Sequence, residues 1–345
     1  MAEERRKTLR LSPKDTDLAA RLLREGELVG LPTETVYGLG ANGLDERAVT
    51  RIFEAKGRPQ DNPLILHIPD RNWLLRCCRE VPETAWRLAE RFWPGPLTMV
   101  LKRAPAVPGV VTAGLDTVGV RCPAHPLCRE VIEKAGVPVA APSGNLSGRP
   151  SPTTAAHMLE DMEGRVAAVL DGGPCTVGVE STIVDLTVTP PRLLRPGGVT
   201  PEALKTVLKG LEIDQGVTRE LSEGEQPRAP GMKYRHYAPN APVTVVRGSP
   251  ADTAAYILEH LEKEDGILCF DEYASLFEGY TVYPMGSEED SGEQARRLFD
   301  ALRAFDATGA GRIWAQSPEE CGLGLAVTNR LNKAAGFHVI RLQGK

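Results

Sequence analysis

The sequence predicts an α/β protein with a larger first domain and a smaller second one. With 345 residues, the chain is longer than one hydrophobic core usually spans, which favours two domains. Short apolar segments of strand length alternate with helical segments in both halves, as they do in α/β folds. Residues 211–241 lack this periodicity and are rich in proline, glycine and charge. We therefore expect domains at 1–210 and 242–345, joined by a linker or lid at 211–241.

The first domain is predicted to hold a twisted, mixed sheet with flanking helices. The expected strands lie at 28–31, 64–68, 97–101, 118–121, 137–141, 166–170, 181–186 and 193–195. Helices are expected at 15–27, 45–56, 83–92, 127–134 and 153–160. Gly57 follows the second helix as a C-cap signal. Near the end of the domain, Thr200 can cap a last short helix and Pro201 suits its first position.

The second domain repeats the alternation on a smaller scale. Strands are expected at 243–246, 266–270, 280–283, 312–315 and 338–342, and helices at 251–263, 293–305 and 326–335. About a hundred residues in this order predict a small doubly wound, Rossmann-like domain.

Charge and hydropathy argue against a membrane protein and against a strong nucleic-acid binder. No charge-free apolar run approaches the roughly 20 residues that span a bilayer. The first residues, MAEERRKTLRLSPKD, are charged and lack the apolar core of a signal peptide, so we expect a cytoplasmic protein. Residues 1–210 carry 27 Lys+Arg against 25 Asp+Glu, whereas residues 211–345 carry 14 against 21. The acidic second half is a poor partner for a phosphate backbone.

The sequence does not support a zinc site or either of two common nucleotide-binding motifs. The seven cysteines include no C-x-x-C pair and are expected to be reduced and mostly buried. Cys122, His125 and Cys128 would give zinc only three of its usual four ligands. The run from Gly38 to Gly43 matches G-x-G-x-x-G, but the acidic residue ending the next strand, Asp70, comes 27 positions after Gly43 instead of about 20. A Walker A lysine is missing too.

Several polar residues stand where strands or helices end. Lys56 and Arg58 flank a tight turn and could bind phosphate, although Lys56 could equally complement the dipole of its own helix. The loop PSGNLSG, which contains Ser143 and Asn145, follows an apolar strand and precedes a helix start near Ser151. Such a joint offers hydroxyl and backbone N–H groups to an anion, but for any one serine a polar turn with an N-cap is the better explanation.

Further candidates lie at other strand ends and in the linker. Arg121 ends the strand TVGVR, where an arginine taken alone is better explained as a surface strand end than as a carboxylate ligand. Ser181 and Arg195 occupy similar places, and because ligands of open α/β sheets gather outside strand ends, the three together favour a binding site. In the linker, MKYRHY concentrates cations and aromatic rings in six residues. Tyr234 and His236 could therefore belong to a lid that stacks on a base.

Taken together, these motifs resemble the YrdC-type L-threonylcarbamoyladenylate synthases. The resemblance rests on PTETVYGLG, KGRPQDNPLILHI, PSGNLSG, GVESTIVD and LLRPG, and the linker PGMKYRHYAP resembles the longer, two-domain form of the family. It implies a YrdC-like first domain and an enzyme that forms threonylcarbamoyl-adenylate and pyrophosphate from L-threonine, bicarbonate and ATP. This product serves the N6-threonylcarbamoyladenosine modification of tRNA through a downstream transferase.

The resemblance also implies roles for individual residues. By similarity, ATP would be held by Lys56, Arg58, Asn62, Thr117, Ser143, Ser151 and Arg195, with Lys56 and Arg58 acting on the developing charge. We also expect ATP contacts from Asn145 in the PSGNLSG loop and from Tyr234 and His236 in the linker. Threonine would be held by Thr35, His67, Arg121, the backbone at Ala141, and Ser181. Mg²⁺ is expected with the ATP phosphates, without an identified protein ligand.

Two other functions remain open at this stage. A carbamoyl-adenylate-forming transferase would share the core domain, but such chains carry additional cysteine pairs that are missing here. An RNA-binding or ribosome-associated module is the alternative from another class, and the net charge of only +2 over residues 1–210 argues against it.

Overall fold

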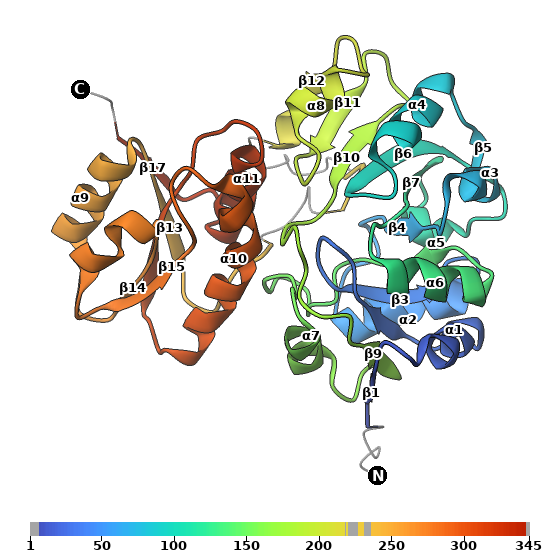
Figure 1. Ribbon diagram of the computed structural model, residues 1–345, viewed down its shortest axis with the longest axis horizontal. Helices are drawn as coiled ribbons and strands as arrows, with labels where there is room; N and C mark the ends of the chain where they lie inside the picture. The colour runs from blue at the N-terminus through green and yellow to red at the C-terminus, as the bar shows by residue number, and fades with distance from the viewer. Residues whose placement is uncertain (1–6, 218, 220–226, 231–235, 343–345) are drawn as a thin grey trace. The chain divides into compact units, whose positions relative to one another are not determined.

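The computed structural model describes residues 7–217, 219, 227–230 and 236–342 (Figure 1). Residue contacts divide the chain into two compact units. The first unit comprises Met1–Ser147, Pro152–Thr176 and Glu180–Lys233, and the second comprises Gly148–Ser151, Val177–Val179 and Tyr234–Lys345.

A mixed β-sheet forms the frame of the first unit. Its strands are hydrogen-bonded in the order β1-β9-β2-β3-β8-β4-β7-β6-β10-β11-β12, and β5 pairs separately with β6. Both parallel and antiparallel pairs occur, for example β4 with β7 and β7 with β6 respectively. The strands are β1 (Leu9–Leu11), β2 (Val29–Leu31), β3 (Gly38–Asn42), β4 (Ile65–His67), β5 (Cys78–Glu80), β6 (Leu97–Arg103), β7 (Thr117–Arg121), β8 (Val139–Ala140), β9 (Ala168–Leu170), β10 (Thr182–Asp185), β11 (Arg192–Arg195) and β12 (Glu212–Ile213).

The predicted helices of this unit begin and end close to their expected limits, and the unit also contains two short helices, α3 and α5, that were not predicted. They are α1 (Thr16–Arg24), α2 (Glu46–Lys56), α3 (Leu74–Cys77), α4 (Glu83–Phe92), α5 (Gly109–Thr112), α6 (Pro126–Ala135), α7 (Ala155–Met162) and α8 (Pro201–Lys205), with 3₁₀ turns at Arg71–Trp73 and Gln215–Val217. Helix α2 has a clear capping residue at each end. The Asp45 side chain accepts hydrogen bonds from two first-turn N–H groups, and Gly57 adopts the left-handed conformation with φ 61°. Thr200 caps α8 and Pro201 is its first residue, as predicted.

Alternation along the strands divides the apolar side chains between two clusters. In β9, Val169 belongs to one cluster, whereas Ala168 and Leu170 belong to the other, because successive side chains point to opposite faces of a sheet. Helices α1 and α6 contribute to the second cluster, and α2, α4 and α7 contribute to the first. The sheet is therefore covered by helices on both faces.

The second unit is a parallel five-stranded sheet with the order β15-β14-β16-β13-β17. Its strands are β13 (Val243–Arg247), β14 (Asp265–Cys269), β15 (Thr281–Pro284), β16 (Arg312–Gln316) and β17 (Val339–Arg341). Its helices are α9 (Pro250–His260), α10 (Ser291–Ala304) and α11 (Gly324–Ala334), with 3₁₀ turns at Asp271–Phe277 and Phe305–Ala307. In Figure 1, α9 lies on one side of this sheet and α10 and α11 on the other, which is the doubly wound arrangement expected.

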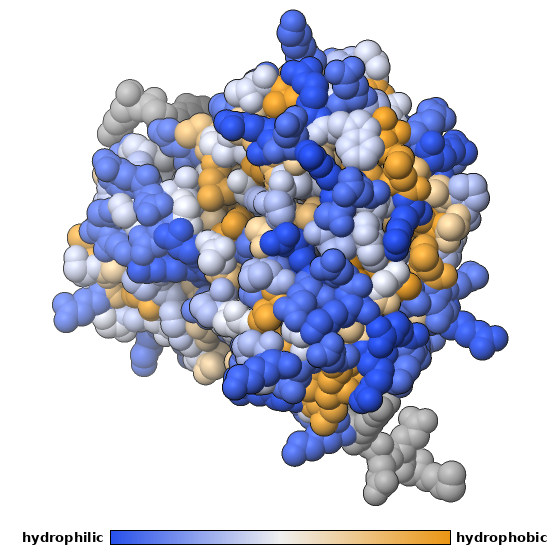
Figure 2. Space-filling model, turned by 45° about the vertical axis from the view of Figure 1, so that its right-hand side comes forward, coloured by the Kyte–Doolittle hydropathy of each residue, from blue (hydrophilic) through white to orange (hydrophobic). Residues whose placement is uncertain are grey.

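The structure adds elements that the periodicity did not predict. Residues 38–42, the first part of the glycine-rich G-x-G-x-x-G run, form strand β3, so Gly38 and Gly40 lie inside a sheet and not in a phosphate-binding loop. Strands β1, β5 and β12 and helices α3 and α5 are too short to produce a recognisable period. On the face in Figure 2, apolar side chains lie in separate patches among polar ones. Within the described residues, no helix combines the length and the apolar character needed to cross a membrane.

Candidate active site

Three polar side chains of the candidate site come from one cross-strand row. His67 on β4 is the register partner of Arg121 on β7, and Arg121 is the partner of Thr98 on β6. Directly opposite residues on neighbouring strands project from the same face of a sheet. The row continues through Ile183 on β10 to Arg195 on β11. Segments far apart in the sequence thus deliver two arginines and a histidine to one line across the sheet.

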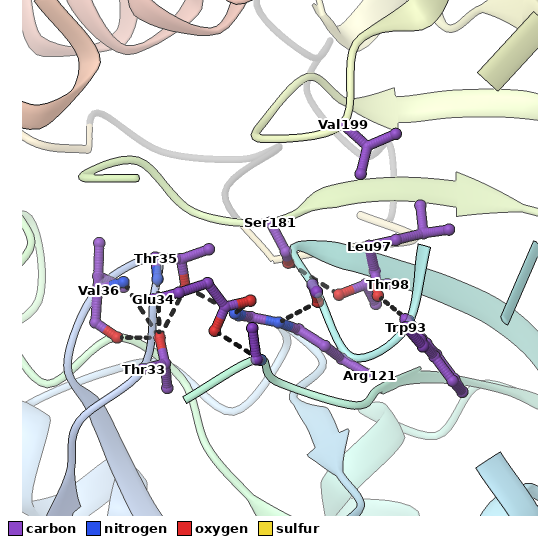
Figure 3. A network of polar contacts seen from close by, with 12 residues as sticks. Thr33, Glu34, Thr35, Val36, Trp93, Leu97, Thr98, Arg121, Ser181 and Val199 are labelled. Carbon is purple, nitrogen blue, oxygen red and sulfur yellow. Dashed lines mark hydrogen bonds and ion pairs between the residues drawn. The ribbon is translucent and has the colours of Figure 1, made fainter. Parts of the chain in front are cut away.

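Arg121 is the central charge of this row and is only 4% exposed (Figure 3). Its Nη1 donates to Thr35 Oγ1 at 2.9 Å, and its Nε donates to the Gly95 carbonyl at 3.3 Å. Its Nη2 lies 2.7 Å from Glu34 Oε1 in a buried ion pair. The other carboxylate oxygen of Glu34 accepts from the Ala124 N–H at 3.0 Å. The guanidinium is therefore held in place by Glu34 and Thr35, two adjacent residues of the PTET segment (residues 32–35).

The PTET segment is a tight turn organised by Thr33. Its hydroxyl donates to the Val36 carbonyl at 2.7 Å and lies 2.8 Å from Thr35 Oγ1. The backbone N–H groups of Thr35 and Val36 point to the same oxygen. Such side chain to backbone bonds let a threonine build a turn without regular secondary structure. The turn places Thr35 against Arg121.

His67 is a neutral side chain in this structure. Burial, reinforced by the charge of Arg121, lowers its pKa from 6.5 to about 3. Its Nδ1 lies 3.4 Å from the Ile65 carbonyl. A neutral imidazole beside Arg121 can offer a hydrogen bond without adding a second positive charge.

Ser181 and Arg195 form the other end of the row. Arg195 donates to the Ser181 carbonyl at 3.0 Å through Nε and to Ser181 Oγ at 3.1 Å through Nη2. Ser181 Oγ also lies 2.8 Å from Thr98 Oγ1. Through Nη1, Arg195 donates to the carbonyl of Pro230 in the predicted linker at 3.2 Å. The linker thus returns to the sheet at the end of β11.

Lys56 holds the loop that carries two other predicted residues. Its ammonium group donates to the backbone carbonyls of Ser143, at 2.6 Å, and of Asn145. Lys56 and Asn145 are buried, whereas Ser143 is half-buried. Upstream of the loop, the Ala141 N–H donates to Ile65 on β4 at 3.0 Å. Lys56 therefore fixes the backbone of the PSGNLSG loop relative to helix α2.

Arg58 and Asn62 close the loop that follows helix α2. One Arg58 Nη2 donates to the carbonyls of Asn62, at 3.2 Å, and Pro63, at 3.1 Å. Asn62 is 1% exposed, and its Oδ1 has no hydrogen-bond partner among the described residues. A buried amide oxygen of this kind is normally satisfied, so it is suited to a ligand donor.

Four of the predicted ATP residues are not part of the contacts described above. Thr117 begins β7, four residues before Arg121, and a strand rises about 3.3 Å per residue, which puts them about 13 Å apart. Ser151 and His236 belong to the second unit, and Tyr234 lies outside the described residues. Their assignments to ATP remain predictions.

The structure also reveals contributors that sequence reasoning missed. Thr33 and Glu34 lie inside the quoted PTET motif, and Thr98 lies inside a predicted strand. An acidic residue in a short polar segment suggests an exposed turn, yet Glu34 is 7% exposed. In the sequence, the one feature that could have pointed to Glu34 is its place in the quoted motif, directly before Thr35.

The arrangement suits charge stabilisation more than covalent chemistry. Buried arginines, a buried lysine and backbone groups at strand ends can hold anionic groups. In the part of the chain that the structure describes, no three His, Cys, Asp or Glu side chains are grouped so as to hold a metal ion.

The fold and the site define a two-domain α/β protein whose mixed sheet carries a site with buried arginine and lysine side chains. Comparison with known proteins narrows this class. The Sua5/YciO/YrdC family, described as telomere recombination, matches residues 21–197, and a family described as the threonylcarbamoyl-AMP synthase C-terminal domain matches residues 199–336. The chain belongs to the Sua5/YrdC family of threonylcarbamoyl-AMP synthases.

Relatives of this family match almost the whole chain. Threonylcarbamoyl-AMP synthase of Pyrococcus abyssi is 50% identical over 94% of this chain and 95% of its own length. That of Bacillus subtilis is 47% identical over 96% of each. A crystal structure of P. abyssi Sua5 complexed with L-threonine has a TM-score of 0.88 and 46% identity, covering 97% of this chain and 99% of the other.

Proposed function

We propose that this chain is an L-threonylcarbamoyladenylate synthase, a nucleotidyltransferase that uses L-threonine, bicarbonate and ATP. The amine of threonine and bicarbonate give a carbamate and water. A carbamate oxygen then attacks the α-phosphorus of ATP, and pyrophosphate leaves. The product, threonylcarbamoyl-adenylate, would pass to a downstream transferase for the N6-threonylcarbamoyladenosine modification of tRNA.

The observation that carries this proposal is the buried Arg121 guanidinium between Thr35 and Glu34. A guanidinium held in one orientation is suited to the carboxylate of an amino acid. His67 and Ser181 lie close by, His67 as the β4 partner of Arg121 and Ser181 through Thr98. The threonine-bound P. abyssi structure, whose fold this chain shares, supports threonine as the ligand of this group.

The ATP assignments rest on chemistry and on the family's motifs. In-line displacement at phosphorus needs fixed positive charge and N–H dipoles more than a nucleophilic side chain. We assign that task to Lys56, Arg58 and Arg195, with Asn62, Ser143 and Asn145 as hydrogen-bonding partners in the same unit. Mg²⁺ would come with the ATP phosphates, because Mg²⁺ in nucleotide sites is bound largely by substrate phosphates and water.

The proposal is tested by substrate dependence. Purified full-length protein with Mg²⁺ and ATP should release pyrophosphate only when threonine and bicarbonate are both present. Release with carbamoyl phosphate in their place would indicate the carbamoyl-adenylate chemistry instead. Tight RNA binding without threonine-dependent release would favour the RNA-binding alternative and overturn the proposal.

A further inference from the structure

The contact between Glu34 and Arg121 leaves hydrogen-bonding capacity unused. Glu34 Oε1 and Arg121 Nη2 lie 2.7 Å apart as an ion pair, and both side chains are less than 10% exposed. Beyond their contact with each other, neither of these two atoms has a partner among the described residues, although Nη2 carries two hydrogens and Oε1 two lone pairs. Buried charged groups normally satisfy their hydrogen bonds, because leaving them unmade is costly. The pair therefore presents one unused donor position and one unused acceptor position side by side.

The hydroxyl of Thr35 is a second acceptor, because the direction of its hydrogen is fixed. Thr33 gives its only hydroxyl hydrogen to the Val36 carbonyl, which can only accept. In the 2.8 Å contact between the two hydroxyls, Thr35 must consequently be the donor. Thr35 Oγ1 already accepts from Arg121 Nη1, which leaves it one lone pair and no hydrogen for a ligand.

Charge balance selects the ligand that fits these positions. Arg121 and Glu34 together are neutral, so a ligand with a carboxylate alone would bury one uncompensated negative charge. A zwitterion buries none. Its carboxylate can take the unused N–H of Arg121 Nη2, and its ammonium can donate to Glu34 Oε1 and Thr35 Oγ1.

We propose that Glu34 is a specificity-determining residue that binds the α-ammonium group of the amino-acid substrate, and that Thr33 is a positioning residue that makes Thr35 a second acceptor for it. This assignment rests on the proposed function, since threonine is taken as the amino acid. The same two acceptors serve the N–H groups of the amine after it loses its proton. The site therefore recognises both ends of the amino acid, and not the carboxylate alone.

The first test uses the wild-type full-length protein and two ligands, measured by calorimetry without ATP. L-Threonine is compared with 3-hydroxybutanoate of matching configuration, which keeps the carboxylate, hydroxyl and methyl groups and lacks the ammonium. A hydrogen bond to a charged group predicts at least about ten-fold weaker binding of the second ligand. Equal affinities would overturn the inference while leaving the proposed function intact. Failure of threonine itself to bind would overturn both.

The second test couples the ligand change to Glu34→Gln, which keeps the shape and removes the charge. Threonine affinity should fall about ten- to a hundred-fold, whereas 3-hydroxybutanoate should bind as tightly as before or more tightly, because its carboxylate then compensates the charge of Arg121. If Glu34 only braced Arg121, both ligands would weaken by the same factor, and if it only competed for Arg121, both would bind more tightly. Either pattern contradicts the assignment. Glu34→Asp, which keeps the carboxylate, should recover part of the loss, and it replaces Glu34→Gln should the latter not fold.

Matched substitutions separate the specific effect from general ones. Glu80→Gln removes an exposed carboxylate paired with Lys102 on the same sheet and should change neither affinity. Thr33→Ser keeps the hydroxyl and should bind threonine like the wild type. Thr33→Val frees the Thr35 hydrogen, so it should weaken threonine more than 3-hydroxybutanoate. Equal effects of Thr33→Val on both ligands would contradict the role given to Thr33.

Discussion

A buried guanidinium such as that of Arg121 persists only because its surroundings compensate its charge. Transfer of an unpaired charge from water to a protein interior costs several kcal/mol, so Glu34, Thr35 and the Gly95 carbonyl are needed for Arg121 to lie at the end of β7. The same contacts fix its orientation. The recognition of a carboxylate that we propose for Arg121 therefore depends on the same contacts that stabilise its charge.

Arg121→Lys should weaken threonine binding and leave ATP affinity little changed. Lysine keeps the charge, but a single ammonium cannot contact Glu34, Thr35 and a carboxylate with the planar geometry of a guanidinium. We expect the Michaelis constant for threonine to rise about ten-fold or more, as for the loss of a charged hydrogen bond. Steady-state pyrophosphate release, with threonine and ATP varied separately, measures this. An unchanged constant for threonine would refute the assignment of Arg121.

His67 should make the protein less stable as the pH falls. Its folded-state pKa is about 3 and its ordinary value is 6.5, so between these values the unfolded chain binds more protons. The free energy of unfolding should therefore decrease from about pH 6.5 downward, by up to about 1.4 kcal/mol per pH unit from this group. In His67→Gln that contribution is missing. Urea unfolding of both proteins at pH 7.5, 6.0 and 5.0 should show the wild type losing more stability, and parallel pH dependences would contradict this.

At the scale of elements, the end of helix α2 connects one helix with two loops. Lys56 lies in its last turn, Gly57 stops it in the left-handed conformation, and Arg58 begins the next loop. The lysine reaches the carbonyls of the PSGNLSG loop, so the helix end sets the position of Ser143 and Asn145. A basic residue in a last helical turn here does more than complement the helix dipole.

Lys56→Ala should reduce turnover about a hundred- to a thousand-fold, as the loss of a fixed oxyanion donor does. Its removal also takes a hydrogen-bond donor away from the carbonyls of Ser143 and Asn145, so the melting temperature should fall as well. Lys102→Ala, which removes a half-exposed lysine paired with Glu80 on the same unit, serves as the matched control. A folded Lys56→Ala protein with near wild-type turnover would exclude a role in phosphate chemistry.

The described residues of the linker on either side of 231–235 each pack against one of the two units. Ala229 packs with Ile65, Val100, Ile183 and Leu194, and Pro230 accepts from Arg195. At its other end, Tyr237 is buried and stacks near Phe299 of the second unit at 5.2 Å. The segment that we predict to act as a lid, residues 229–239, includes residues 231–235, which lie outside the described part of the chain. Its function as a lid remains a prediction.

Replacing residues 232–236 by Gly and Ser should impair the reaction without unfolding either unit. A lid protects a mixed anhydride from water, so the variant should consume ATP poorly or lose its product by hydrolysis. Tyr237 is kept because its removal would disturb the core of the second unit. Intact adenylate and pyrophosphate are measured together. Wild-type yields of both would show that the linker is a simple tether.

On the scale of the whole molecule, the burial of the cysteines shows how far the two hydrophobic cores exclude solvent. All seven are free, and six are buried while Cys321 is exposed. Burial raises the pKa of Cys77, Cys122, Cys128, Cys175 and Cys269 to about 12 and raises that of Cys78 as well. Protonated, inaccessible thiols react slowly with electrophiles.

A thiol reagent should therefore distinguish the native from the unfolded chain. Under native conditions at pH 8, one equivalent should react quickly, and that reaction should disappear in Cys321→Ser. In denaturant, seven equivalents should react. Rapid reaction of two or more thiols in the native protein would indicate that one of the cores opens.

The sequence by itself determined the local features of this protein. Signals next to each other in the chain predicted helix α2 with its Gly57 stop, α4 at its observed limits, and the Thr200 cap of α8. These features follow from a few neighbouring residues, whose caps and periodicity act over one or two turns. The motifs also pointed to Arg121, Thr35 and Lys56 as site residues, an assignment that stays a prediction.

Only the tertiary structure decided which of these residues meet. His67, Arg121 and Thr98 share a row because the strand order is β4-β7-β6, an order that local periodicity does not contain. Glu34 is an example from the site itself. In the sequence it is one acid in a short polar segment, and it becomes a buried partner of Arg121 only because β7 ends beside the PTET turn. Strand pairing brings together residues that are distant in the chain. Only after that pairing is Glu34 buried beside Arg121, where the two opposite charges interact strongly.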